Sequence, residues 1–158
     1  MDRDLALRLR IDALMADYVH CIDGDRLEEW PGFFVDGGTY AVTTRENHEL
    51  GLPMSILYCK GQGMLRDRIA ALRSANIYEP QVYCHIVGAV KVLESVAGEH
   101  HTLANFTVTR TMADGAMALF ACGRYVDRIV EDAGVLRFRD RLVVLDSRRI
   151  DTLLAIPL

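Results

Sequence analysis

The feature that most constrains the fold of this chain is a change in the spacing of its apolar residues. Near the N-terminus, large apolar side chains recur at helical spacing: Ile11, Leu14, Met15, Tyr18, Val19 and Ile22. This spacing predicts an amphipathic helix over about residues 4–22. From Val82 onward, apolar and polar residues alternate instead, as they do in strands with one buried face. Turn-forming pairs divide this region into four expected strands, near 82–95, 101–112, 116–130 and 135–147.

The segments between these two regions are shorter. We expect a second helix over 25–30 that Pro31-Gly32 ends, a strand over 39–44, a loop over 45–62 with a short strand near 55–58, and a third helix over 64–74. Helices followed by an antiparallel meander predict an α+β fold, with three N-terminal helices packed on a strongly curved, mainly antiparallel sheet. Because no linker or repeat divides the chain, we expect a single domain over residues 1–158.

Composition and charge exclude several classes of function. The chain has 158 residues, of which 51% are hydrophobic, so it can bury one core without metal or disulfide support. Its formal charge of −4 argues against a nucleic-acid surface. The four cysteines are widely spaced, as expected of free thiols in a reducing compartment. With neither a signal peptide nor a membrane span in the sequence, we expect a soluble, cytoplasmic protein.

Two adjacent histidine and cysteine pairs resemble metal ligands but have the wrong spacing. His20 and Cys21 are neighbours on a predicted helix, where successive side chains point about 100° apart. Cys84 and His85 form one Cys-His pair, whereas a Rieske cluster needs two. The remaining histidines have no helical ligand spacing for a facial iron triad, although the sequence alone does not exclude one. We therefore expect no metal in this chain.

Asp23 and His85 form the strongest catalytic candidate. An acid at the end of the first helix is placed to orient a histidine on the first long strand, which then acts as a general base. The alternative, which we favour, is that Asp23 caps a turn and His85 is a hydrogen-bonded core or interface residue. Four tyrosines are candidates to line the same pocket or to pack with the hydroxyl at an edge: Tyr18, Tyr40, Tyr83 and Tyr125.

Two features near the C-terminus predict subunit contacts. Arg137, Arg139 and Arg141 alternate with apolar residues, which places three guanidinium groups on one face of a strand. Such a row is either solvated or faced by acidic groups, from a neighbouring strand or from a partner. The apolar ending, with Leu154, Ile156 and Leu158, is expected to be docked on protein. We treat these six residues as interface candidates.

Five stretches together resemble a known family. They are "IDGDRLEEWPGFF", "YAVTTRENHELGLP", "MLRDRIAALRSANIYE", "YCHIVG" and "DSRRIDTLLAIPL". In this order they resemble the small (β) subunits of Rieske-type aromatic-ring-hydroxylating dioxygenases, particularly the terephthalate dioxygenase branch. The match spans nearly the whole chain. One departure is Cys84, because many relatives have arginine there, so an interface salt bridge made by that arginine would be missing.

The resemblance implies a cone-shaped NTF2-like fold (cystatin-like, SnoaL-like) and a non-catalytic role. In that family three β subunits support three large α subunits in an α3β3 hexamer. The Rieske [2Fe–2S] cluster and the mononuclear Fe(II) belong to the α subunit, and a reductase supplies electrons. The substrate would be an aromatic acid of the terephthalate or benzoate type. The alternative is a stand-alone isomerase or dehydratase of the same fold that uses Asp23 and His85.

Overall fold

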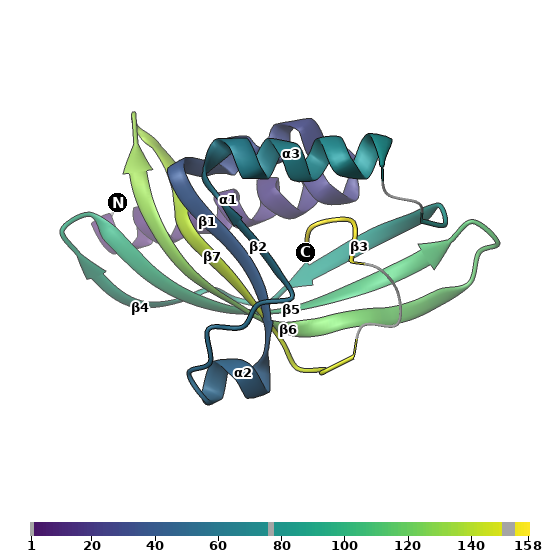
Figure 1. Cartoon of the computed structure of the whole chain (residues 1–158). Helices are drawn as coiled ribbons and strands as arrows, with labels where there is room; N and C mark the ends of the chain where they lie inside the picture. Colours follow the sequence, from purple (N-terminus) through teal and green to yellow (C-terminus); the bar gives the residue numbers. More distant parts are fainter. Residues whose placement is uncertain (1, 76–77, 150–153) are drawn as a thin grey trace.

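The computed structural model describes residues 2–75, 78–149 and 154–158 (Figure 1). The elements in chain order are α1 (Arg3–Asp23), η1 (Leu27–Phe33), β1 (Phe34–Thr44), α2 (Arg45–Glu49), β2 (Leu57–Lys60), α3 (Gly61–Ser74), β3 (Gln81–Val87), β4 (Lys91–Val96), β5 (Glu99–Met112), β6 (Met117–Asp132) and β7 (Val135–Leu145). Two of the family-like stretches extend into residues 76–77 and 150–153, which lie outside the described part. Among the described residues no helix is long and apolar enough to cross a membrane.

The strands form one curved sheet in the order β2-β1-β7-β6-β5-β3, and β4 also pairs with β5. The β1–β7 pairing is parallel and the other pairings are antiparallel. Figure 1 shows α1 and α3 on one side of this sheet and α2 on the opposite side. The predicted α+β fold, with helices on a strongly curved and mainly antiparallel sheet, is confirmed.

The two long helices lie where the apolar spacing predicted them. The side chain of Asp2 caps α1 by accepting a hydrogen bond from the main-chain nitrogen of Asp4 at 3.3 Å. All six residues of the predicted apolar face of α1 are buried. On α3 the apolar residues Leu65, Ile69 and Leu72 also recur at helical spacing and are buried, and this helix begins at Gly61, three residues earlier than expected. Amphipathic spacing was therefore a sufficient signal for both helices.

The predicted second helix was wrong in type and position. It is the 3-10 helix η1, which contains Pro31 instead of ending before it. Asp25 does not begin it because its φ of 56° is not helical. Residues 36–38, Asp-Gly-Gly, have a sequence typical of a turn but form an irregularity inside β1, whose pairing register with β7 shifts between Phe34 and Thr39.

Two further expectations need correction. The predicted loop over 45–62 contains the short helix α2, and the short strand expected near 55–58 is β2, which begins and ends two residues later. The strand expected near 82–95 is divided at residues 88–90 into β3 and β4, which pair with different parts of β5. The main-chain nitrogen of Gly88 donates to Asn105 on β5 at 2.8 Å, so the chain stays close to β5 where the strand breaks.

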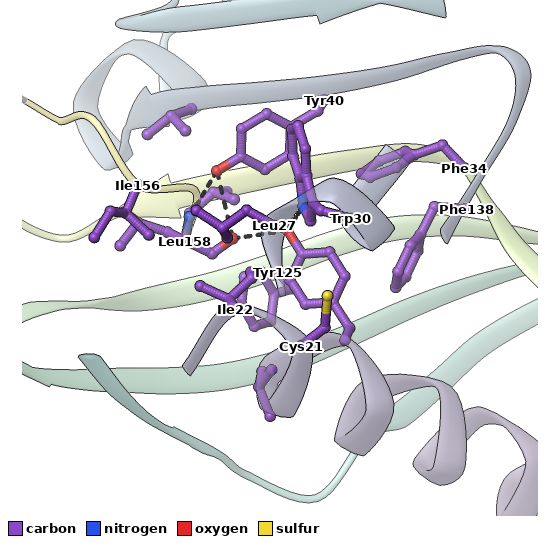
Figure 2. Packing of buried hydrophobic residues seen from close by; sticks show 14 of the residues in the cluster. Cys21, Ile22, Leu27, Trp30, Phe34, Tyr40, Tyr125, Phe138, Ile156 and Leu158 are labelled. Atoms are coloured by element: carbon purple, nitrogen blue, oxygen red, sulfur yellow. Dashed lines mark hydrogen bonds between the residues drawn. The ribbon is translucent and has the colours of Figure 1, made fainter. Parts of the chain in front are cut away.

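Aromatic rings and the C-terminal residues fill the space between the helices and the concave face of the sheet (Figure 2). Trp30 packs edge-to-face against Tyr40 at 5.0 Å and against Phe34 at 5.4 Å between ring centroids. Leu158 enters the same cluster and is fully buried. The interior of the cone is therefore packed by the chain itself.

Candidate functional site

Asp23 and His85 lie in direct contact where α1 ends beside β3. His85 Nδ1 is 2.5 Å from Asp23 Oδ1, and the main-chain nitrogen of His85 donates to Asp23 Oδ2 at 2.8 Å. An ionised carboxylate only accepts hydrogen bonds, so we assign the imidazole proton to Nδ1. The His85 side chain is fully buried, and its Nε2 has no hydrogen-bond partner among the described residues. The pair thus holds an oriented imidazole with one unused acceptor atom.

Two of the four candidate pocket tyrosines bind the end of the chain. Tyr18 and Tyr40 are fully buried. The Tyr18 hydroxyl donates to the main-chain oxygen of Leu158 at 2.9 Å and accepts from Trp30 Nε1 at 3.1 Å. The Tyr40 hydroxyl accepts from the main-chain nitrogen of Leu158 at 2.9 Å (Figure 2). Burial raises the pKa of Tyr18 to about 12, so its hydroxyl stays neutral and serves as a donor.

The other two tyrosines are packing residues. The Tyr125 ring stacks on Phe106 with centroids 4.4 Å apart, and its buried hydroxyl has no partner among the described residues. Tyr83 packs against Phe120 at 5.2 Å between centroids. All four tyrosine side chains are at most 3% exposed. The structure therefore places them in a packed interior instead of an open pocket.

Arg141 does not share a face with Arg137 and Arg139, and the predicted three-arginine row was wrong. The β6–β7 register shifts so that Arg128 pairs with Asp140 while the next residue, Ile129, pairs with Phe138. This bulge leaves one extra residue in β7 and reverses the alternation beyond it. Arg141 consequently points into the core, where it is fully buried.

Inside the core Arg141 has an acidic partner and aromatic neighbours. Its Nε and Nη2 donate to the two carboxylate oxygens of Asp127 at 3.0 and 2.9 Å. The guanidinium carbon lies 4.2, 3.8 and 4.1 Å from the ring centroids of Tyr18, Tyr125 and Phe138. Burial raises the pKa of Asp127, and the charge of Arg141 opposes that rise. Of the alternatives open from sequence, an acidic neighbouring strand is the one found for Arg141.

The apolar ending is docked on its own chain. Leu154, Ile156 and Leu158 are 7%, 8% and 0% exposed and belong to the hydrophobic core. Arg68 on α3 donates to the main-chain oxygens of Leu154 and Ala155. The expectation that this end is docked on protein is met, but by the cone itself. These three side chains are therefore not free for subunit contacts.

Arg137 and Arg139 line a charged groove of about 780 Å3 on the rim of the sheet. Arg137 pairs with Asp132 at 3.3 Å, and Arg139 donates to Glu99 at 2.7 Å. Glu99 also accepts from Arg128 at 2.7 Å. Sequence reasoning missed Glu99 and Arg128 because they come from two other strands, and their proximity depends on the strand register.

The Cys-His pairs cannot hold one ion between them. Cys21 is buried whereas His20 is exposed, and Cys84 is exposed whereas His85 is buried. Adjacent residues on a strand point to opposite faces of the sheet, and those on a helix point well apart. Within residues 2–75, 78–149 and 154–158, no three histidine, cysteine, aspartate or glutamate side chains gather as a metal site.

A family model for the SnoaL-like domain matches residues 3–142. The fold and the packed cone thus define a SnoaL-like domain. The chain is 37% identical to the anthranilate 1,2-dioxygenase small subunit of Burkholderia cepacia, covering 100% of this chain and 98% of that one. It is 41% identical to the terephthalate 1,2-dioxygenase terminal oxygenase component subunit beta 2 of Comamonas sp, covering 95% and 97%.

A solved structure gives the same result. It is described as the β subunit of an aromatic-ring-hydroxylating dioxygenase from Novosphingobium aromaticivorans, and it superposes with a TM-score of 0.91 at 37% identity, covering 99% of this chain and 100% of that one. The chain belongs to the family of small (β) subunits of aromatic-ring-hydroxylating dioxygenases. The resemblance inferred from five sequence stretches is confirmed.

Proposed function

We propose that this chain is a non-catalytic, structural subunit of an aromatic-ring-hydroxylating dioxygenase. The observation that carries the proposal is its identity of 37–41% over 95–100% of its length to small and beta subunits of such enzymes. In the proposed complex three copies support three large α subunits as an α3β3 hexamer in the cytoplasm. The α subunits hold the Rieske [2Fe–2S] cluster and the mononuclear Fe(II), and a reductase delivers the electrons.

The packing of the cone supports a scaffolding role. Trp30, Tyr18, Tyr40 and Leu158 occupy the volume that a substrate would need, and the two hydroxyls bind the main chain of Leu158. These buried hydroxyl groups thus stabilise the fold. The complex as a whole would dihydroxylate an aromatic acid of the terephthalate or benzoate type, using O2 and NAD(P)H-derived electrons.

We place the α subunit on the charged rim. Arg137 and Arg139 lie in a groove that also contains Arg66 and Lys60, two cations with no ion pair to any described residue. Arginine is enriched in protein interfaces because its planar guanidinium binds carboxylates through two hydrogen bonds. The groove also holds the carboxylates of Asp36, Glu131, Asp132 and Asp140. The partner that we propose is therefore a segment of the α subunit whose acidic side chains reach the two cations that lack an ion pair to a described residue, Arg66 and Lys60.

Co-expression with a large oxygenase subunit of this family tests the proposal. With a tag on the large subunit alone, we expect this chain to copurify at equal molar amount, with a mass that corresponds to three of each. A matched expression without this chain should give a large subunit that is unassembled and inactive in ring hydroxylation. A large subunit that assembles and turns over equally well without this chain would overturn the proposed role.

A second function rests on the contact of 2.5 Å between Asp23 and His85 and on the partnerless Nε2. In this function, a substrate that reaches this nitrogen would be deprotonated by it, as the general base of an isomerase or dehydratase reaction. The test is turnover of hydroxylated and ketone substrates by the isolated chain, with His85→Ala and Asp23→Asn as comparisons. Equal rates for the wild type and both variants would exclude this function.

A further inference from the structure

The outer face of the sheet carries an uncharged patch whose large apolar side chains are exposed. Val82, Cys84 and Ile86 of β3 lie opposite Thr111, Thr109 and Thr107 of β5. The next strand, β6, continues these three rows with Met117, Leu119 and Cys122. We call these nine residues the sheet patch. Its four large apolar side chains are 60–70% exposed, and it contains no charged residue.

A second uncharged patch lies on residues 50–58, which follow α2 and include the first two residues of β2. Five large apolar side chains are 45–66% exposed there: Leu50, Leu52, Met54, Ile56 and Tyr58. We call residues 50–58 the loop patch. It contains no charged residue either, although a quarter of the whole chain is charged.

The main chain of the loop patch is fixed, so its exposed side chains are presented in a defined arrangement. The nitrogen of Ile56 donates to Val42 at 2.7 Å, and the Thr43 hydroxyl donates to the oxygen of Met54 at 2.9 Å. Figure 1 shows α2 and the segment after it projecting on the side of the sheet opposite α1 and α3. A segment that is held in place before contact loses little entropy on binding.

The two patches are large enough for a specific contact. Each exposes apolar surface on the order of 400–500 Å2, within the range that marks interaction sites on monomers. Burying one patch against the other, with a polar rim, would reach the roughly 1,200 Å2 at which specific interfaces begin. Exposed apolar surface of this extent favours association in water.

We propose that copies of this chain associate head to tail, with the loop patch of one copy packed on the sheet patch of the next. This inference rests on the proposed function and names the contact that holds its three β subunits together. Contact between copies covers both patches, because each copy offers its loop patch to one neighbour and its sheet patch to the next. A different partner that covered only one patch would leave the other patch exposed to water. Neither patch carries charge, so contact between like chains brings no like charges together.

The two patches lie on different parts of the fold, which favours a ring. The sheet patch lies on three adjacent strands, whereas the loop patch lies on the segment after α2, so the proposed contact joins two different surfaces. A head-to-tail contact repeats around an axis and closes when the rotation allows. Three copies close such a ring in the proposed hexamer.

Analytical ultracentrifugation of the isolated full-length chain tests the proposal. We expect the wild type to sediment as an oligomer, and Leu119→Asp in the sheet patch or Met54→Asp in the loop patch to sediment as a monomer. Leu93→Asp is the matched control, because Leu93 is an equally exposed strand residue, 53% accessible, outside both patches. Circular dichroism and urea unfolding confirm that each variant is folded. If Leu119→Asp fails to fold, Met117→Lys introduces a charge into the same patch.

Mixing the two monomeric variants distinguishes a head-to-tail contact from a two-fold contact. Leu119→Asp retains the loop patch and Met54→Asp retains the sheet patch, so an equimolar mixture should form a heterodimer. A wild type that stays monomeric, a variant that keeps the wild-type mass, or a mixture that stays monomeric would overturn the proposal. If Leu119→Asp blocks copurification with the α subunit but leaves self-association intact, the sheet patch belongs to the α subunit. That result would refute this inference and leave the proposed function standing.

Discussion

Arg141 is the residue at which the core departs most from an ordinary apolar packing. A charge that is removed from water is tolerated when its partner and its hydrogen bonds compensate for the lost hydration. Asp127 provides both through two hydrogen bonds, and three aromatic rings surround the rest of the guanidinium. The pair joins β6 to β7 below α1, so it fixes the register of the two strands where the bulge ends.

Removing one charge of this pair should lower the free energy of unfolding far more than removing both charges. We expect Asp127→Asn to lower the free energy of unfolding by about 3–5 kcal/mol, because the guanidinium stays buried without an anion. The double variant Asp127→Leu/Arg141→Met should be close to the wild type, since it leaves no buried charge. Urea unfolding measures all three proteins. A double variant less stable than Asp127→Asn would contradict this account.

The tyrosine hydroxyls of the interior differ in whether they have a partner. Tyr40→Phe leaves the buried main-chain nitrogen of Leu158 without its acceptor. This substitution should lower the free energy of unfolding by about 1–3 kcal/mol. Tyr125→Phe is the matched control, because the Tyr125 hydroxyl has no partner among the described residues. Its removal should be neutral or slightly stabilising. Equal losses of unfolding free energy for the two variants would show that the docked C-terminal residue contributes nothing through Tyr40.

Residue contacts were predictable only where a local signal pointed to them. The Asp23–His85 contact was one of two alternatives and not the favoured one; it was considered because an acid at a helix end and a histidine on a strand lie at element boundaries that the sequence reveals. The binding of Leu158 by Tyr18 joins residues 140 positions apart. No periodicity or motif connects them, so the four tyrosines looked equivalent in the sequence, whereas the structure has two binding residues and two packing residues.

At the scale of elements, regular spacing was informative and irregularities were hidden. The faces of α1 and α3 and most strands follow from periods of 3.6 and two. A bulge inserts one residue without changing composition, so the Arg137, Arg139 and Arg141 alternation looked continuous although the register shifts beside Arg139. The break between β3 and β4 was missed for a related reason, because Gly88 interrupts the pairing but not the overall strand character.

The β6–β7 pairing depends on a glycine at close approach. A Cβ at Gly123 would overlap the main-chain oxygen of Val144 on β7. We expect Gly123→Ala to separate the two strands locally and to lower stability by about 2–4 kcal/mol, as strained core substitutions do. Gly32→Ala is the control, because a Cβ there meets nothing within 4 Å. Thermal unfolding of the two variants gives the comparison, and similar midpoints would refute the steric argument.

Glu99 joins three strands and makes their association pH-dependent. Hydrogen bonds from His101 and from Arg128 lower the pKa of Glu99. A carboxyl group whose pKa is lower in the folded state stabilises the fold above its unfolded pKa of about 4.3 and loses that effect as pH falls through the folded value. The stability difference between the wild type and Glu99→Gln should therefore be present at pH 6 and shrink below about pH 4. Urea unfolding across this range tests it, and a difference that is independent of pH would contradict it.

At the scale of the whole molecule, the surface separates into regions of different chemistry. The sheet patch and the loop patch are uncharged, whereas the rim groove concentrates arginine, lysine and acidic side chains. Family membership was readable from sequence because the five stretches are continuous in the chain. The sheet patch and the rim groove could not be read from the sequence. Each is assembled from several strands and exists only after the sheet has formed.

The separation of these surfaces predicts that their functions can be separated by mutation. Charge reversal in the double variant Arg137→Glu/Arg139→Glu should reduce the rate of association with the α subunit by about tenfold or more at low salt, because the charged groove steers and orients the partner. The reduction should diminish as ionic strength rises. Arg8→Glu on α1 is the control, an exposed arginine outside the groove. Surface plasmon resonance against the immobilised α subunit measures the rates.

Self-association of the same double variant completes the test. Because the sheet patch and the loop patch are untouched, the variant should sediment as the wild type does while its binding to the α subunit is weakened. An effect on both processes would mean that one surface serves both partners. An effect on neither would remove Arg137 and Arg139 from the interface, and the acidic residues of the groove, beginning with Asp36, would be the next to reverse.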